Sequence, residues 1–323
     1  MLLGIWVINI SLGSVHIPFR DVIKILFGQE TLNPTWETIV LQLRLPRSVT
    51  AVIVGAGLSF AGLLMQTYFR NPMAGPSVLG ISSGASLGVA LFLMGSGFFG
   101  FHIMSGLGMV LSAVLGSIVV LLLIVLLSVR LKNNLSILII GLMLGALTSS
   151  IVGVLSYFST SEQIKTYVLW NLGSLGHVDW KGIIVMILVV LIGFMLMFFK
   201  SNALNTLLVG ETFAKSVGVS TEHLTYIILA ITGVIVGVIT AYVGPIAFVG
   251  LAVPHMARLV LKTSDHKLLL PVVLLMGSIV LLVCDLLAQL PFYERVIPIN
   301  SVTSLIGAPI VIYLILKQRH YDF

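Results

Sequence analysis

The chain has 323 residues, of which 58% are hydrophobic and only 9% charged, and its mean hydropathy is +1.15. Because a soluble domain carries about 25% charged residues, this composition excludes a water-soluble globular protein. The basic residues that give the net charge of +6 lie mostly between apolar segments, which indicates membrane topology and not nucleic-acid binding. The single cysteine, Cys284, excludes an internal disulfide. We therefore expect an all-α, multi-pass membrane protein.

Long apolar runs predict the membrane-spanning helices, because about 20 residues cross the hydrocarbon layer. In chain order we place spans at 49–69, 78–97, 103–129, 135–158, 182–199, 224–243, 246–261, 268–290 and 301–316. The run 246–261 is short and contains Pro254, so we expect it to be kinked or partly buried in protein. The opening run, 1–12, has the length of half a span, so we expect an incomplete first helix or a segment that does not cross. It lacks the features of a cleavable signal peptide.

The distribution of lysine and arginine predicts the orientation of the chain. A cytoplasmic C-terminus places a modest excess of these residues on the inner side. Arg44 and Arg47 are exceptions, because they precede the span 49–69 on the outer side. A function at the outer face would explain their position.

Two segments are neither regular spans nor ordinary loops. Residues 70–77 and 80–86 lie where the predicted span 78–97 begins, and Pro and Gly residues interrupt the helix there. Irregular backbone at membrane depth is tolerated only where protein or a water-filled cavity satisfies it, so this segment is a candidate wall of a path. Residues 210–219 predict a short cytoplasmic helix that ends at Gly218, a C-cap signal. Both a docking surface and an ordinary loop helix fit this second segment.

The chain lacks the usual motifs of nucleotide and metal chemistry. It contains no Gly-x-x-x-x-Gly-Lys-Ser/Thr loop, no His-Glu-x-x-His motif and no Cys/His cluster, so we expect no catalytic residues, metal or cofactor. Asp285 fits either an interfacial position or a proton relay. His255, after Pro254, fits either a ligand or a histidine bonded within a kinked helix. Ion-driven carriers need more membrane carboxylates than this, so we expect a partner to supply the energy.

Several sequence blocks resemble the permeases of the iron–siderophore, haem and cobalamin ABC importers, and they occur in that family's order over nearly the whole chain. The blocks are Leu43-Arg44-Leu45-Pro46-Arg47, residues 62–66 with 70–76 and 79–85, Trp170 with 173–175, Gly210-Glu211 through Gly218, residues 244–255 with Arg258, and Thr303 with Gly307-Ala308-Pro309.

The resemblance implies ten spans, with two inverted repeats, 49–158 and 224–316, after the first helix. It implies a single transmembrane permease domain in the bacterial cytoplasmic membrane. The partners would be two ABC ATPase subunits, a periplasmic or lipid-anchored substrate-binding protein, a second permease subunit (identical or paralogous) and membrane lipid. Iron–siderophore is the leading cargo, with cobalamin and haem as alternatives.

The resemblance also assigns roles to individual residues. Arg44 and Arg47 would dock glutamates of the binding protein, and Arg295 is a candidate substitute for the basic residue that the family has where Gln289 stands here. Residues 210–219 would form the coupling helix that sits on the ATPase, with Glu211, Phe213, Ala214, Lys215 and Gly218 as its coupling residues. The candidate path or gate residues, expected at the inner mouth, are Ser82, Ser83, Asn133, Asn134 and Ser136.

Two other functions remain open from the sequence. An ion-coupled secondary transporter would share inverted repeats and broken spans, but it would transport without an ATPase. An intramembrane enzyme would have only Asp285 and His255 as acid–base candidates, and these lie on different predicted spans.

Overall fold

The computed structural model describes residues 1–13, 15, 17–29, 33–99, 106–130, 134–289 and 296–318. Within these ranges the chain forms helices and connecting segments, without a strand. In chain order the helices are α1 (Leu2–Ser11), α2 (Phe19–Leu26), α3 (Pro34–Thr38), the π-helical η1 (Ile39–Arg44), α4 (Leu45–Phe69), the 3-10 turn η2 (Pro76–Leu79), α5 (Ile81–Phe99), α6 (Gly106–Arg130), α7 (Asn134–Tyr157), α8 (Ser161–Asn171), α9 (Trp180–Phe198), α10 (Ser201–Val209), α11 (Glu211–Ser216), α12 (Thr221–Val243), α13 (Val249–Leu261), α14 (His266–Ala288) and α15 (Ile299–Gln318).

The apolar helices agree with the predicted all-α, multi-pass fold. By length and composition, six described helices can cross a membrane: the continuous helix Pro34–Phe69, α6, α7, α9, α12 and α14. Four shorter apolar helices accompany them, namely α1, α5, α13 and α15. All nine predicted spans therefore correspond to apolar helices. The opening run forms the short helix α1, as expected.

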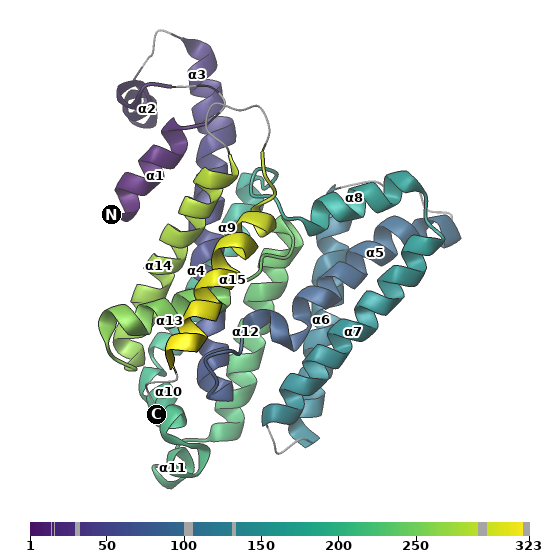
Figure 1. The fold of residues 1–323 in the computed structure, drawn as a ribbon, viewed down its shortest axis with the longest axis vertical. Coiled ribbons are helices and arrows are strands. Elements are labelled where there is room, and N and C mark those ends of the chain that lie inside the picture. Colours follow the sequence, from purple (N-terminus) through teal and green to yellow (C-terminus); the bar gives the residue numbers. More distant parts are fainter. Residues whose placement is uncertain are drawn as a thin grey trace.

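The two ends of the helical bundle differ in character (Figure 1). Helices α2, α3 and α8 lie at one end, and the short helices α10 and α11 lie at the other. The orientation that follows from lysine and arginine makes the α10–α11 end the cytoplasmic one. Helix α12 connects the two ends, since it starts beside α11 and finishes beside the loop after α8.

Helix α4 lies at the centre of the bundle and is buried along nearly its whole length. It packs against α14, α13, α12 and α9. The crossing with α13 is very close, because a Cβ added to Gly62 would lie 1.7 Å from the carbonyl oxygen of Gly250. The crossing with α14 is similar at Gly55 and Gly277. Small residues within these helices thus allow the helix backbones to come close together.

The predicted start of the first full span, residue 49, is wrong. The helix begins at Pro34 and continues through η1 into α4, so Arg44 and Arg47 lie within a helix and not in a loop before it. Pro46 normally breaks a helix because it lacks an N–H and its ring clashes with the preceding turn. The wider π-helical turn directly before it relieves that clash.

The segment after α4 is irregular, as the sequence predicts. Arg70 ends α4 in the left-handed conformation with φ 48°, and Gly80 has φ 73° between η2 and α5. A Cβ at Gly80 would lie 2.8 Å from the carbonyl oxygen of Gly141 on α7. The segment therefore packs between helices and does not form a surface loop. Pro254 is likewise buried inside the short helix α13, as expected for the span 246–261.

Candidate functional site

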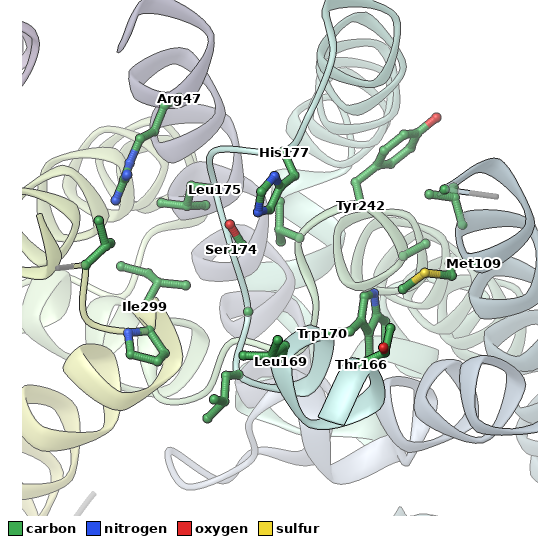
Figure 2. Close-up of a pocket in the computed structure, with 18 of the residues that line it drawn as sticks. Arg47, Met109, Thr166, Leu169, Trp170, Ser174, Leu175, His177, Tyr242 and Ile299 are labelled. Carbon is green, nitrogen blue, oxygen red and sulfur yellow. The ribbon is translucent and has the colours of Figure 1, made fainter. Parts of the chain in front are cut away.

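A cavity of about 530 Å³ opens near the outer end of the bundle. Figure 2 shows Arg47 from α4 and Tyr242 from α12 on opposite sides of it, with His177 and Ser174 between them and Trp170 below. Its wall combines aromatic and aliphatic surface with a few polar groups. A concave, mostly apolar wall with a few polar groups is typical of a surface that receives a ligand or a partner.

The loop after α8 forms one side of this cavity and is fixed by backbone hydrogen bonds. Ser174 N–H donates to the carbonyl of Val243 at 2.9 Å, and Asn300 N–H donates to the carbonyl of Leu172 at 3.2 Å. Gly173 and Gly244 both adopt positive φ, +76° and +78°, and a Cβ on Gly244 would lie 2.4 Å from the carbonyl of Trp170. These contacts join the ends of α8, α12 and the start of α15 into one wall.

Arg47 at the rim of the cavity forms a buried ion pair. Its Nη2 lies 2.8 Å from Oδ1 of Asp285, whose side chain is fully buried on α14. Asn9 from α1 and Gln289 from α14 donate to the other carboxylate oxygen at 3.1 and 2.7 Å. The carboxylate thus has three hydrogen-bonding partners, as a buried charge requires. Asp285 lies about one turn from the outer end of α14, and its carboxylate is fully paired, so it is not free to act as a relay in this structure.

Arg44 does not lie at the outer surface. The residue is only 8% exposed, and its guanidinium donates to the carbonyls of Ile10 and Ser11 at the end of α1 and of Val15 in the segment that follows. Arg44 is therefore held by carbonyl groups at and beyond the C-terminus of α1, which helix geometry leaves free, and its role in docking stays a prediction. Arg295, the third predicted docking residue, lies outside the described residues.

The predicted coupling residues come together on α11 at the inner end. Glu211 and Lys215 form a surface ion pair at 2.9 Å, and Thr221 at the start of α12 donates to Glu211 at 3.3 Å. Ala214 is buried, whereas the ring of Phe213 is 46% exposed. The helix thus packs through Ala214 and leaves Glu211, Phe213 and Lys215 exposed.

Gly218 terminates α11 as the sequence predicts. It adopts φ +85°, its N–H donates to the carbonyl of Lys215, and Val219 N–H donates to that of Ala214. These two bonds form the Schellman motif, which satisfies the free carbonyls at a helix end. The sequence missed the preceding helix, α10, which turns the predicted single coupling helix into a helical pair.

The candidate gate residues do not share one level of the membrane. Ser82 bonds with Thr240 near the outer end of α12 at 3.3 Å, and Ser83 lies against Gly145 of α7. Gly145 follows Ser136 by nine residues, which corresponds to about 13 Å along α7. The structure therefore separates Ser83 from Ser136 along α7, and a shared gate of these residues stays a prediction. Asn134 begins α7 with Ser136 in its first turn, and Asn133 lies outside the described residues.

Sequence reasoning also missed polar contacts that join distant helices. The pairing of Arg47 with Asp285 had a signal, since two isolated opposite charges near one membrane face tend to pair. The hydrogen bond between Asn205 on α10 and His266 at the start of α14 had no such signal, because both residues belong to short segments of ordinary polarity.

An outer cavity, a packed bundle of apolar helices and an exposed helical pair on the inner face define a membrane transport subunit. Among the described residues, no three His, Cys, Asp or Glu side chains cluster as a metal site would require. The profile of the FecCD transport family matches residues 1–317, and the chain belongs to this family. It is an ABC importer permease and a multi-pass protein of the bacterial cytoplasmic membrane.

Relatives and solved structures agree with this assignment. The chain is 34% identical over 320 residues to the vitamin B12 import system permease protein BtuC of Salmonella typhimurium, covering 97% of this chain and 95% of the relative. It is 36% identical over 313 residues to BtuC of Citrobacter koseri, covering 95% and 93%. A solved ABC transporter of the metal-chelate type, in an inward-facing conformation, matches with a TM-score of 0.85 and 32% identity over 98% of this chain and 96% of the other. PsaBC from Streptococcus pneumoniae shares the fold alone, with a TM-score of 0.59 and 14% identity over 91% of this chain and 95% of the other.

Proposed function

We propose that this chain is the translocation subunit of an ATP-driven importer for a bulky metal chelate. Two separate ATPase subunits would hydrolyse ATP on its inner face. A substrate-binding protein would deliver the chelate to its outer face, and a second permease subunit, identical or paralogous, would complete the path. One observation carries the proposal: a single chain joins an outer cavity to an exposed inner helical pair, and its sequence contains no phosphate-binding loop.

The inner helical pair, α10 and α11, is the feature that supports the proposal of ATPase partners. Helices α10 and α11 project at the cytoplasmic end, and α11 carries exposed side chains of three kinds: apolar Phe213, acidic Glu211 and basic Lys215. An aromatic anchor with flanking charges is typical of a protein–protein contact. Gly218 fixes where the helix ends and so sets the orientation of that surface.

The outer cavity is the feature that supports the proposal of a binding-protein partner. Arg47 lines the cavity and its side chain is 20% exposed, so a carboxylate of the binding protein can approach it while Asp285 holds it in place. Charges at the rim of an interface orient docking more than they add affinity. Arg47 and Arg295 are the residues that we propose for this contact, and Arg44 stabilises the end of α1.

The helix contacts support two inverted repeats. Helix α4, first in the proposed repeat 49–158, packs on α14, which is third in the repeat 224–316. Helix α12, first in the second repeat, packs on α6, which is third in the first. This exchange of equivalent contacts is what an inverted pair would give, and such pairs place a path at their interface.

The chemical class of the cargo is proposed from the relatives. Some carry vitamin B12, a cobalt chelate, and one solved relative belongs to the metal-chelate type. An iron–siderophore complex is the leading candidate within this class. Cobalamin is the second, and the 34–36% identity to vitamin B12 permeases favours it. Haem is a third member of the class.

Uptake of radiolabelled chelates into proteoliposomes tests the cargo. The complex with its ATPase and binding protein should accumulate one of ferric siderophore, cobalamin and haem, and an excess of that chelate without label should compete. Accumulation of free metal ions but of no chelate would contradict the proposed class.

Substitutions on α11 test the inner contact. Glu211→Ala should reduce transport several-fold while changing the free energy of unfolding by less than about 1 kcal/mol, because it removes an exposed ion pair. Lys24→Ala, which breaks the exposed Asp21–Lys24 pair on α2, is the matched control and should leave transport unchanged. Equal transport by the two variants would show that Glu211 is not part of the contact with the ATPase.

A further inference from the structure

A cluster of polar side chains joins three helices near the cytoplasmic end of the bundle. His266 begins α14 and its side chain is fully buried. Its Nδ1 lies 2.7 Å from Oδ1 of Asn205 on α10, and its Nε2 lies 2.7 Å from Oγ1 of Thr67 on α4. One imidazole ring therefore connects the helix before α11 to α4 and α14, two helices that pack extensively on each other.

The orientation of the Asn205 amide follows from its partners. Its Oδ1 also accepts the backbone N–H of His266 at 2.9 Å, and its Nδ2 donates to Oδ1 of Asp265 at 2.8 Å. A carboxylate accepts only and a backbone N–H donates only, so the amide cannot be reversed. Asp265 also caps α14 through the backbone N–H of Lys267 at 3.0 Å. Asn205 is thus bound to the first turn of α14 by three hydrogen bonds.

The end of α4 extends the connection to a further helix. Gln66, the residue before Thr67, donates to the carbonyl of Leu251 on α13 at 3.0 Å, and its Oε1 accepts from Arg258 of α13 at 2.5 Å. Adjacent residues of α4 therefore hold α13 on one side and α14 on the other. Buried polar contacts of this kind fix helix positions, because breaking one leaves an unsatisfied group in a nonpolar surrounding.

Helix α10 is well placed to move with α11. Only Gly210 separates the two helices, and they pack against each other. Helix α10 also contacts α14 and α4. A displacement of α11 therefore acts on Asn205, and through Asn205 on the buried ring of His266.

We propose that His266 is a positioning residue, which together with Asn205 and Thr67 transmits movement of the α10–α11 pair to α4 and α14. This inference rests on the proposed contact between α11 and the ATPase. It adds a specific route for the movement. Helix α14 would shift together with α10, because the first turn of α14 is hydrogen-bonded to Asn205 of α10.

The ratio of chelate transported to ATP hydrolysed tests this route, measured in proteoliposomes that contain the whole complex. Thr67→Val removes the bond to His266, and with it the hydroxyl's bond to the carbonyl of Leu63, but keeps the shape of the side chain. His266→Gln removes the imidazole ring and its contact with Asn205. Thr232→Val is the matched control, because Thr232 is equally buried and its hydroxyl has no hydrogen-bond partner among the described residues. His223→Gln, at an exposed position on α12, is the control for the histidine.

We expect Thr67→Val to lower the ratio by about fivefold, the factor that corresponds to one buried hydrogen bond of ordinary strength. His266→Gln should lower it further, while ATP hydrolysis continues and both control variants keep the wild-type ratio. If His266→Gln fails to assemble, Thr67→Val carries the test alone. A wild-type ratio in Thr67→Val would overturn the inference. A wild-type complex that hydrolyses ATP without transporting any chelate would instead overturn the proposed function.

Discussion

The guanidinium of Arg47 on α4 lies 2.8 Å from the carboxylate of Asp285 on α14, and Asn9 and Gln289 complete the coordination of that carboxylate. The pair joins the outer ends of two helices whose inner ends are joined by Thr67 and His266. Helices α4 and α14 are thus bonded by polar side chains at both ends, with the close glycine contacts between them.

Removal of one partner of the outer pair should destabilise the protein strongly. Arg47→Ala leaves the carboxylate of Asp285 buried without its cation, so we expect a loss of about 3 to 5 kcal/mol in the free energy of unfolding. Thermal unfolding of the purified protein in detergent measures this loss. The double variant Arg47→Met with Asp285→Leu should recover most of it, because no unpaired charge remains. A double variant as unstable as Arg47→Ala would contradict this account of the pair.

The crossing of α4 and α13 should not tolerate a side chain. Gly62→Ala places a methyl group where the carbonyl of Gly250 already lies, so the helices must separate. We expect a loss of about 3 kcal/mol or more in stability, at the upper end of overpacking effects. Gly153→Ala on α7 is the control, since nothing lies within 4 Å of its added Cβ. Similar unfolding temperatures for the two variants would show that the crossing is not close.

The end of α11 should depend on the backbone conformation of Gly218. At φ +85° an alanine costs about 1 kcal/mol, although its Cβ would meet no neighbouring atom. We expect Gly218→Ala to reduce transport by the assembled complex and Gly218→Asn to reduce it less, because asparagine adopts this conformation more readily. Transport assays on both variants give the comparison. Equal loss in the two variants would point to a role for the space at this position instead of its φ angle.

The cap of α14 should make stability depend on pH. The amide of Asn205 and the backbone N–H of Lys267 donate to the Asp265 carboxylate and hold its pKa below the usual range. Because the folded pKa lies below the unfolded value of about 3.9, the contribution is fully present above about pH 4. It is lost as the pH falls through the folded pKa.

Asp265→Asn tests this cap. The variant should unfold at a lower temperature than the wild type at neutral pH, and the difference should shrink as the pH falls below about 4. A difference that stays constant down to about pH 3 would show that the charge of Asp265 contributes nothing to the cap.

Hydropathy alone predicted most of the helices, because the bilayer allows few alternatives to an apolar helix. The boundary at Pro34 was missed because an apolar window does not detect a π-helical turn that accommodates Pro46. Helix α10 was missed because it is short and contains no strong capping signal. In both places the geometry of neighbouring helices decides the structure, and the local sequence does not.

The candidate sites were predictable to different degrees. The end of α11 at Gly218 follows from a local backbone rule and was predicted correctly. The position of Arg44 was not predictable, because its partners are carbonyls of α1 and of the segment after it, more than 25 residues earlier in the chain. The positions of Ser82 and Ser83 along the bundle depend on how α5 packs against α7 and α12, which a single sequence does not reveal.

Uptake by reconstituted vesicles tests the central claim most directly. Purified chain should be placed in proteoliposomes with and without its ATPase subunits, with the binding protein loaded with the chelate on the outside and ATP on the inside. The account predicts concentrative uptake only when the ATPase subunits and ATP are both present, and none from an ion gradient. Accumulation of the chelate by vesicles that contain the permease alone would contradict it.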